Sequence, residues 1–286
     1  MSRTHERFRR VISGSTCVLA ANIFDPLSAR IADMLGYEVC VLSGSVGKAS
    51  NLGVPDIVLS NMSDVVDHCR RITRMAEVSL MVDAEDGFGN AVNVRRTVQE
   101  MEAAGVAAIE IEDNVVPKRF NVQNPGLVSK EEQVGKLQAA VAARTDPSTV
   151  IVARTSALAE CPLEEALDRI QAYATTGAEA LMLATVPRGR ADIAAVHQAT
   201  SLPLCVLNPP AEARNDAAFL AANGVRILML GNPTYAIAVK AIYDALKRLQ
   251  EGTALEDLRE LQASPDLLRA VNRTAEFIQW QQEYLR

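Results

Sequence analysis

The amino-acid sequence predicts an α/β fold, a single (β/α)8 TIM barrel followed by a C-terminal helical extension. Three observations lead to this prediction: eight short apolar segments recur along the chain, amphipathic helical segments alternate with them, and glycine-containing turns separate the two. A chain of 286 residues, 49% of them hydrophobic, is long enough for one barrel, which commonly needs roughly 200–250 residues. We expect residues 1–252 to form the catalytic barrel and residues 253–286 the extension.

The eight apolar segments have the length and composition of strands that are covered on both faces. Each is rich in valine, isoleucine, leucine or methionine and is short enough for a buried parallel strand. The predicted strands are residues 17–22, 39–45, 79–85, 107–113, 149–155, 180–185, 203–208 and 225–231.

Helical periodicity fills the intervals between these strands, most clearly over residues 91–104, 130–143, 163–176 and 234–249. Several helices end at a glycine just before the next strand, where a left-handed C-cap is expected: Gly36, Gly105, Gly177 and Gly224. Strand–helix units with right-handed crossovers close into a barrel. An open doubly wound sheet is the alternative, but no GxGxxG phosphate-binding motif follows the first strand.

Residues 254–286 form a polar, helix-prone extension with the only tryptophan, Trp280. Two arrangements remain open for this extension. It packs either on a neighbouring subunit or on its own barrel.

Composition excludes several classes of partner. The net charge of −6 and the isoelectric point near 5.3 argue against nucleic acid and anionic membranes. No apolar run reaches the roughly 18–20 residues of a membrane helix, and no signal segment follows the polar start, so we expect a cytoplasmic protein. The five cysteines lack CxxC spacing and the three histidines are dispersed, which predicts free thiols and no zinc site of the His/Cys type.

Polar residues concentrate at the carboxyl ends of the predicted strands, where barrel enzymes place their chemistry. The third strand ends in Asp83 and Glu85, the fourth in Glu110 and Glu112, and the fifth in Arg154. Side chains two residues apart share one face of a strand, so each pair of acids is expected to point into the barrel. Inward carboxylates repel one another unless a cation neutralises them, and such hard oxygen ligands suit Mg²⁺ or Mn²⁺. Arg154 is placed to bind a substrate carboxylate through two hydrogen bonds.

Acids at strand ends also act as helix caps or ion-pair partners, and Asp86 or Asp113 taken alone has that structural interpretation. Glu110 lies deeper than the others, and its expected role is to pair with an internal arginine or lysine. Polar strand ends on three successive strands nevertheless favour a functional site.

Six short motifs follow one another along the chain. They are residues 24–30 (FDPLSAR), 43–45 (SGS), 53–56 (GVPD), 83–90 (DAEDGFGN), 111–118 (IEDNVVPK) and 153–155 (ART). In this combination the chain resembles the isocitrate lyase/phosphoenolpyruvate mutase superfamily over nearly its whole length. The resemblance implies a barrel whose last helix is exchanged between subunits of a homotetramer, a dimer of dimers.

The resemblance also implies a metal site. Asp83 would bind Mg²⁺ directly, and Asp56, Glu85 and Glu112 would hold metal-bound waters. Glu85 stands where the family usually has an aspartate, which changes the detailed coordination.

The same resemblance implies residues that bind the substrate. Ser43, Gly44, Ser45 and Val46 would form the loop that binds its carboxylate or enolate oxygen, with the amides of residues 44–47 as donors. Arg154 and Asn232 would orient its carboxylates. The catalytic residues would then be Ser45, Asp83 and Arg154.

Departures from the family motifs distinguish its branches. The lyase branch carries a cysteine acid after the IED strand, but residues 117–121 read PKRFN here, which disfavours cleavage of isocitrate or methylisocitrate. The phosphonopyruvate mutase branch carries a PKxNS loop, which Lys118 fits and Asn121 misses by one place. The pattern is most similar to the bacterial oxaloacetate decarboxylase branch, although that branch has a histidine at the position of Asn232.

We therefore hypothesise Mg²⁺-dependent decarboxylation of oxaloacetate or a close 2-oxo acid to pyruvate, or its analogue, and CO₂ through a metal-stabilised enolate. Solvent can protonate the enolate, so this step needs no protein base. The alternatives are the P–C bond chemistry of a phosphonomutase or phosphonopyruvate hydrolase and C–C cleavage of a substituted malate. From a different class, the barrel would bind a metabolite without catalysis.

Overall fold

A computed structural model describes residues 2–117, 121 and 126–285 of the chain. Contacts divide the chain into two compact units, Met1–Asn232 and Pro233–Arg286. The domain boundary after residue 252 stays a prediction from the sequence.

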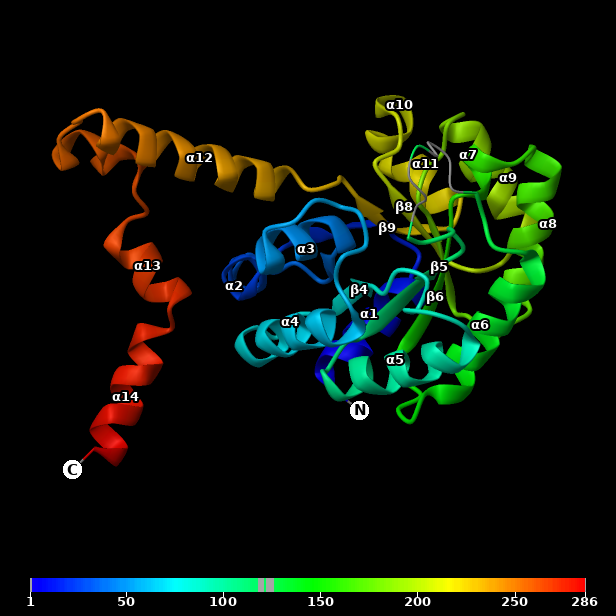
Figure 1. Cartoon of the computed structure of the whole chain (residues 1–286), viewed down its shortest axis with the longest axis horizontal. Coiled ribbons are helices and arrows are strands. Elements are labelled where there is room, and N and C mark those ends of the chain that lie inside the picture. Colours follow the sequence, from blue (N-terminus) through cyan, green and yellow to red (C-terminus); the bar gives the residue numbers. More distant parts are fainter. Residues whose placement is uncertain (1, 118–120, 122–125, 286) are drawn as a thin grey trace. The chain divides into compact units, whose positions relative to one another are not determined.

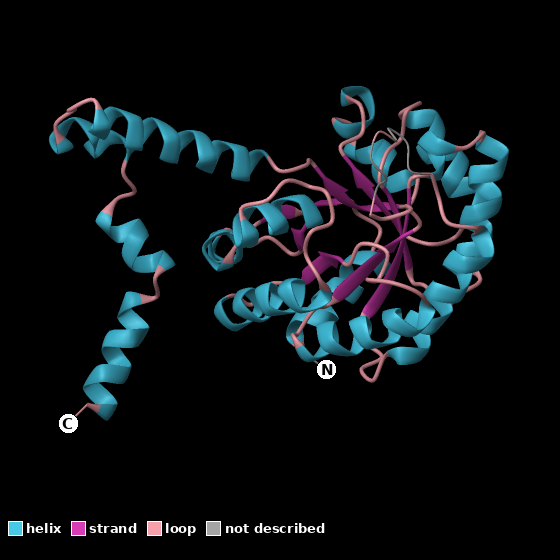
Figure 2. Ribbon diagram, in the orientation of Figure 1, coloured by secondary structure: helices cyan, strands magenta, loops and turns pink. Residues whose placement is uncertain are grey.

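The first unit is built around a parallel sheet that returns on itself (Figures 1 and 2). The sheet order is β1-β9-β8-β7-β6-β5-β4-β3-β2. The backbone amide of Ala20 bonds to Leu228 beside β9, while that of Ala21 bonds to Val39 beside β3, so β1 and β2 are successive halves of one barrel strand. The strands are β1 (Val18–Leu19), β2 (Ala21–Ile23), β3 (Cys40–Leu42), β4 (Leu80–Asp83), β5 (Ala108–Glu112), β6 (Val150–Thr155), β7 (Ala180–Leu183), β8 (Leu204–Leu207) and β9 (Val225–Met229).

Helices surround this sheet (Figure 2), which confirms the predicted TIM barrel. The predicted helices within the barrel are confirmed as α5, α6 and α8, and the glycines at the four expected C-cap turns have φ values of 75° to 90°. The helices of the first unit are α1 (Arg3–Ser13), α2 (Pro26–Met34), α3 (Gly44–Leu52), α4 (Met62–Met75), α5 (Ala91–Ala103), α6 (Lys130–Ala143), α7 (Ala157–Glu160), α8 (Leu163–Ala174), α9 (Arg190–Ala199), α10 (Ala211–Arg214) and α11 (Ala217–Ala222).

Alternation along the strands produces two apolar layers. Val82 and Ile111 belong to the layer between sheet and helices, as predicted, whereas Met81 belongs to the barrel interior. Phe8 and Val11 of α1 pack with the interior residues at the amino ends of the strands. Helix α1, which the sequence analysis did not anticipate, therefore fills the amino end of the barrel and leaves the carboxyl end for polar side chains.

The second unit is helical and consists of α12 (Pro233–Gln250), the 3-10 helix η1 (Leu255–Leu261), α13 (Pro265–Val271) and α14 (Thr274–Tyr284). Helix α12, predicted over residues 234–249, buries none of its residues. Its exposed large apolar side chains are Ile237, Val239, Ile242, Tyr243, Leu246 and Leu249. Within the described ranges, no helix combines the length and apolar character needed to cross a membrane. All five cysteines are free thiols.

Candidate active site

A cavity of about 170 Å³ lies at the carboxyl ends of the barrel strands. Of the predicted site residues, Ser43, Ser45, Asp56, Asp83, Arg154 and Asn232 line it. Gly44, Val46, Glu85 and Glu112 do not line it. The remaining lining residues are Asn22, Val41, Glu110, Met182, Leu207, Met229 and Gly231.

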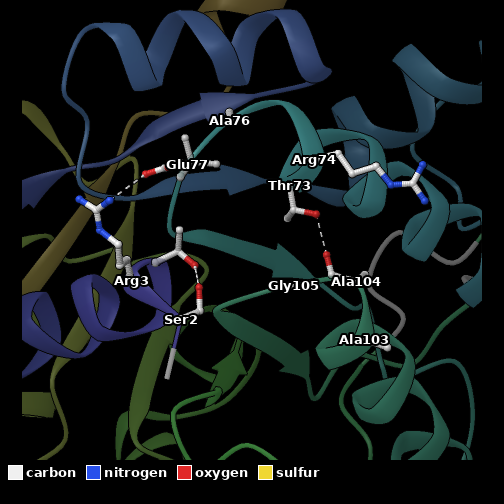
Figure 3. A pocket seen from close by; sticks show the side chains of 11 residues that line it. Ser2, Arg3, Thr73, Arg74, Ala76, Glu77, Ala103, Ala104 and Gly105 are labelled. Carbon is white, nitrogen blue, oxygen red and sulfur yellow. Dashed lines mark hydrogen bonds and ion pairs between the residues drawn. The ribbon is translucent and has the colours of Figure 1, made fainter. Parts of the chain in front are cut away.

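A larger hollow of about 460 Å³ lies elsewhere, between Ser2, Thr73, Glu77 and Gly105 (Figure 3). Glu77 comes shortly before β4 and Gly105 shortly before β5, so the hollow is at the amino ends of the strands. One of its polar contacts joins α4 to the end of α5, the 2.7 Å hydrogen bond from the Thr73 hydroxyl to the Ala104 carbonyl (Figure 3). Because barrel enzymes act at the carboxyl ends, the smaller cavity is the candidate active site.

Strand register brings the acids and the arginine of the site together. Asp83 at the end of β4 is level with Glu110 on β5, and Glu112 is level with Arg154 on β6. The Arg154 Nη1 donates to Oδ2 of Asp83 at 2.5 Å and to Oε2 of Glu110 at 3.2 Å. The Arg154 Nε lies 3.3 Å from Oε2 of Glu112, an ion pair without hydrogen-bond geometry. One guanidinium thus contacts three carboxylates.

Glu110 lies at the bottom of this cluster with 1% of its surface exposed. It pairs with Arg154, which confirms the expected pairing with an internal cation. Its second oxygen, Oε1, has no hydrogen-bond partner among the described residues. Burial outweighs the attraction of Arg154 and raises the pKa of Glu110 to about 7.

A second cation, Lys48 of α3, holds the acids on the other side of Asp83. Its ammonium lies 2.9 Å from Oδ1 of Asp56 and forms a short hydrogen bond with Oε1 of Glu85. Lys48 was not among the predicted site residues, because only the fold brings the first turns of α3 beside the end of β4. The one indication of such a role in the sequence is that Lys48 is the only charged residue in the SGSVGKAS segment, between small residues.

Glu85 lies in a turn after β4. The prediction that it shares one face of the strand with Asp83 is therefore wrong. Strand β4 ends at Asp83, and Glu85 has a φ of 52°, in the left-handed region. Its backbone amide donates to Oδ1 of Asp83 at 3.0 Å, and the Gly44 amide donates to Oδ2 at 3.2 Å. Asp83 is therefore fixed by two backbone amides and by Arg154.

Several buried carboxylates lie close together in the site, and their pKa values are shifted. Burial disfavours the charged form of Asp83, but Arg154 and the two amides outweigh it and lower its pKa. Burial and the nearby Asp83 charge raise the pKa of Glu85 to about 8, against the effect of Lys48. Burial likewise raises the pKa of Glu112 to about 7, although Arg154 opposes it. Additional positive charge at this place would favour the charged forms of Glu85 and Glu112.

The donor set fits a hard divalent cation. Mg²⁺ binds carboxylate oxygens and commonly uses one or two of them while it keeps several waters. A Cβ atom at Gly44 would stand 2.5 Å from Oε1 of Glu85 and 3.2 Å from Oδ2 of Asp83, so the absence of a side chain there keeps space between the two acids. The described residues contain no cluster of three His, Cys, Asp or Glu side chains that by itself could hold a metal. The expected arrangement, with Asp83 as the single direct ligand, requires none.

The opposite wall of the cavity is polar and uncharged. The amide oxygen of Asn232 accepts from the Ser43 hydroxyl at 3.2 Å and from Nδ2 of Asn22 at 3.4 Å. Its nitrogen donates to the Ser45 hydroxyl at 3.2 Å. The structure thus brings Ser43, Ser45 and Asn232 together, as expected, and adds Asn22, which the sequence analysis did not name.

Helix α3 begins directly at this wall. Ser43 is its N-cap residue and Gly44 its first helical residue. The Gly44 amide is used by Asp83 and the Gly47 amide by the Ser43 carbonyl, so these two are not the free donors that were expected. The amides of Ser45 and Val46 belong to the first turn, where no intrahelical acceptor exists.

Two acids next to the site, Asp113 and Asp86, have structural roles, as the sequence suggested. Asp113 is buried and accepts hydrogen bonds from the Thr155 hydroxyl at 2.7 Å and from the Tyr173 hydroxyl at 2.9 Å. Asp86 pairs with the buried Lys136 at 3.2 Å. The Lys118 position that was compared with the phosphonopyruvate mutase loop lies outside the described residues.

The barrel, with its acids and arginine at the carboxyl ends of adjacent strands, defines a (β/α)8-barrel enzyme whose site is built from carboxylates. The chain belongs to the phosphoenolpyruvate phosphomutase family, whose model matches residues 8–250. It is 45% identical over 270 residues to an oxaloacetate decarboxylase of Rhodopseudomonas palustris (strain BisB18), covering 94% of this chain and 93% of that protein.

Two solved structures show the same fold over 99% of this chain. A phosphonopyruvate hydrolase in complex with oxalate and Mg²⁺ has a TM-score of 0.88 and 30% identity, with 99% of that chain covered. A 2,3-dimethylmalate lyase, a member of the PEP mutase/isocitrate lyase superfamily, has a TM-score of 0.86 and 26% identity, with 99% of that chain covered. These findings confirm the resemblance inferred from the six motifs.

Proposed function

We propose that the protein decarboxylates oxaloacetate, or a close 2-oxo acid, to pyruvate (or its analogue) and CO₂ with the help of Mg²⁺, or alternatively Mn²⁺. The observation that carries this proposal is the joint placement of Asp83, Glu110 and Arg154 at the mouth of the barrel. The identity to oxaloacetate decarboxylases supports the choice of substrate.

Asp83 would hold the metal, with Asp56, Glu85 and Glu112 around it. When bound, the cation supplies Lewis acidity, which withdraws electrons from the 2-oxo group of the substrate. Arg154 offers its planar guanidinium to a substrate carboxylate. Because three acids already contact that guanidinium, its position is fixed before substrate arrives.

The remaining steps of the reaction involve Ser45 and Asn232, on the polar wall of the cavity opposite the acids. As the C3–C4 bond breaks, its electron pair moves toward the 2-oxo oxygen and CO₂ leaves. The hydroxyl and the backbone amide of Ser45 are the donors for that developing negative charge. Asn232 orients the departing carboxylate through a neutral hydrogen bond, which stabilises the charged ground state less than an ion pair would.

The lining of the cavity supports decarboxylation over a lyase reaction that uses a cysteine or histidine as its acid. Its described lining includes no histidine and no cysteine. A C–C lyase needs a group to protonate its leaving enolate, whereas the pyruvate enolate can take its proton from solvent.

A P–C bond reaction is the second candidate, because the similar phosphonopyruvate hydrolase shares the fold over the full chain. A screen with Mg²⁺ tests both candidates, using oxaloacetate, phosphonopyruvate, methylisocitrate and alkylmalates. We expect pyruvate from oxaloacetate at a rate well above that of Mg²⁺ alone, without phosphate release from phosphonopyruvate. Phosphate release would establish the second candidate, and two carboxylic acids from an alkylmalate would establish a lyase. Thermal stabilisation by oxalate and Mg²⁺ without turnover would establish a binding protein.

We also propose a cytoplasmic homotetramer in which α12 packs on a second copy of the chain. The exposed apolar side chains of α12 support this arrangement. Ile242→Asp together with Leu246→Asp is expected to dissociate the assembly in light scattering coupled to size-exclusion chromatography. An unchanged mass would contradict the role of α12.

A further inference from the structure

Lys48 is a buried lysine placed between two of the acids assigned above to the metal site. Its side chain is 1% exposed, whereas that of Asp56 is 60% exposed and that of Glu85 is 7% exposed. A lysine is seldom this buried unless its charge is paired. Here the pairing is double, with Asp56 at 2.9 Å and a short hydrogen bond to Glu85.

The ammonium also lies near Asp83. The position of a Cβ atom at Gly44 would be 3.1 Å from Nζ of Lys48 and 3.2 Å from Oδ2 of Asp83. Both groups therefore border the same small space above Gly44. A divalent cation on Asp83 would stand close to the Lys48 charge and would share Glu85 and Asp56 with it.

Lys48 does not act on the substrate directly. It is absent from the lining of the 170 Å³ cavity and instead borders a much smaller space on the other side of α3, beside Asn51, Leu52 and His68. Any influence on the reaction must pass through Glu85 and Asp56. Lys48 is thus a positioning residue.

We propose that Lys48 is an internal counter-ion of the acidic site, which holds Asp56 and Glu85 in place without a metal and lowers the affinity of the site for a divalent cation. This inference rests on the proposed metal site at Asp83. The physical reason is Coulombic: a fixed positive charge beside the site repels the incoming cation and competes for its ligands.

The test measures metal affinity and stability without any turnover. Mg²⁺ and Mn²⁺ are titrated calorimetrically into the full-length protein and its Lys48→Met variant at pH 9, where carboxyl protons compete least with the metal. We expect the dissociation constant of Mg²⁺ to fall about tenfold in Lys48→Met. We expect the metal-free variant to melt about 5 °C below the wild type, because two acids lose their partner.

Lys136→Met is the matched control. Lys136 is also a buried lysine, 2% exposed, and pairs with an acid, Asp86, but it does not contact Asp56, Glu85 or Asp83. This variant should melt at a lower temperature than the wild type and keep its Mg²⁺ affinity. A purely structural role of Lys48 would give the same result for both variants.

The outcomes separate the two proposals. If the wild type binds neither Mg²⁺ nor Mn²⁺, the metal site and the role of Lys48 are both wrong. If the wild type binds metal and Lys48→Met binds it equally well or more weakly, only the role of Lys48 is wrong. Should Lys48→Met not fold, Lys48→Gln keeps a polar group without the charge, and the same increase in affinity is required of it.

Discussion

Arg154 and Asp83 lie on strands separated by β5, yet their side chains are joined by a hydrogen bond of 2.5 Å between Nη1 and Oδ2. This contact crosses the mouth of the barrel above Glu110. It links the residue assigned to the metal with the residue assigned to the substrate carboxylate, so each fixes the position of the other.

Replacement of Arg154 tests this link. Arg154→Lys keeps the charge but loses the fork of donors, and we expect its kcat/KM for oxaloacetate to fall about a hundredfold, mainly through KM. Arg154→Ala leaves three carboxylates without their cation and should lose about a thousandfold, roughly 4 kcal/mol. Steady-state pyruvate formation provides the measurement. Arg144→Lys, at an arginine paired with Glu179 near the amino end of β6, is the control with unchanged KM. Equal kinetics of Arg154→Lys and wild type would contradict the assignment.

The buried Glu110 makes metal-free stability depend on pH. Its pKa is about 7 in the folded protein because of burial, above its ordinary value, so the folded state holds a proton that the unfolded state has lost. This stabilisation is fully present below about pH 4.5 and is lost as the pH rises through about 7. We expect the metal-free unfolding free energy to fall by roughly 3 kcal/mol across this window on account of Glu110.

Glu110→Gln removes that part of the pH dependence, since glutamine does not titrate. In urea unfolding with a chelator, the variant should show a shallower loss of stability between about pH 4.5 and about pH 7, the span of the two pKa values, than the wild type. Glu131→Gln, at an exposed glutamate, is the control and should retain the wild-type slope. The same slope in Glu110→Gln would show that Glu110 is not the titrating group.

Asn232 contributes a neutral donor to the cavity. Asn232→Ala removes its hydrogen bonds to Ser43 and Ser45, and we expect kcat/KM to fall about tenfold to a hundredfold. Asn232→Asp keeps the shape but places a negative charge beside a dianionic substrate, so its loss should exceed that of the alanine variant. The measurement is the kcat/KM of both variants for oxaloacetate. A more active aspartate variant would exclude Asn232 from contact with a substrate carboxylate.

The elements of the barrel followed from local patterns. The strands and the helices α5, α6, α8 and α12 have strong hydrophobic periodicity. Periodicity and turn glycines depend only on residues close together in the sequence, so they could be recognised without the fold. Helix α1 was not predicted, because the partners of Phe8 and Val11 come from strands throughout the chain.

The site was predictable where strand alternation determines it. Asp83, Glu110 and Arg154 came together as expected since parallel strands end at one edge of the barrel. Lys48 depends on the path of a loop and on the first turns of α3, which no periodicity specifies. The left-handed turn at Glu85 was not predicted either, because no periodicity specifies it.

The central claim is that Asp83 anchors the cation that makes decarboxylation possible. The most direct test compares wild type and Asp83→Ala for pyruvate formation from oxaloacetate in Mg²⁺, after subtraction of the enzyme-free rate, with circular dichroism to establish that both are folded. We predict that the folded variant loses at least about a thousandfold in kcat/KM and no longer responds to Mg²⁺. A folded Asp83→Ala protein with undiminished Mg²⁺-dependent turnover would contradict the claim.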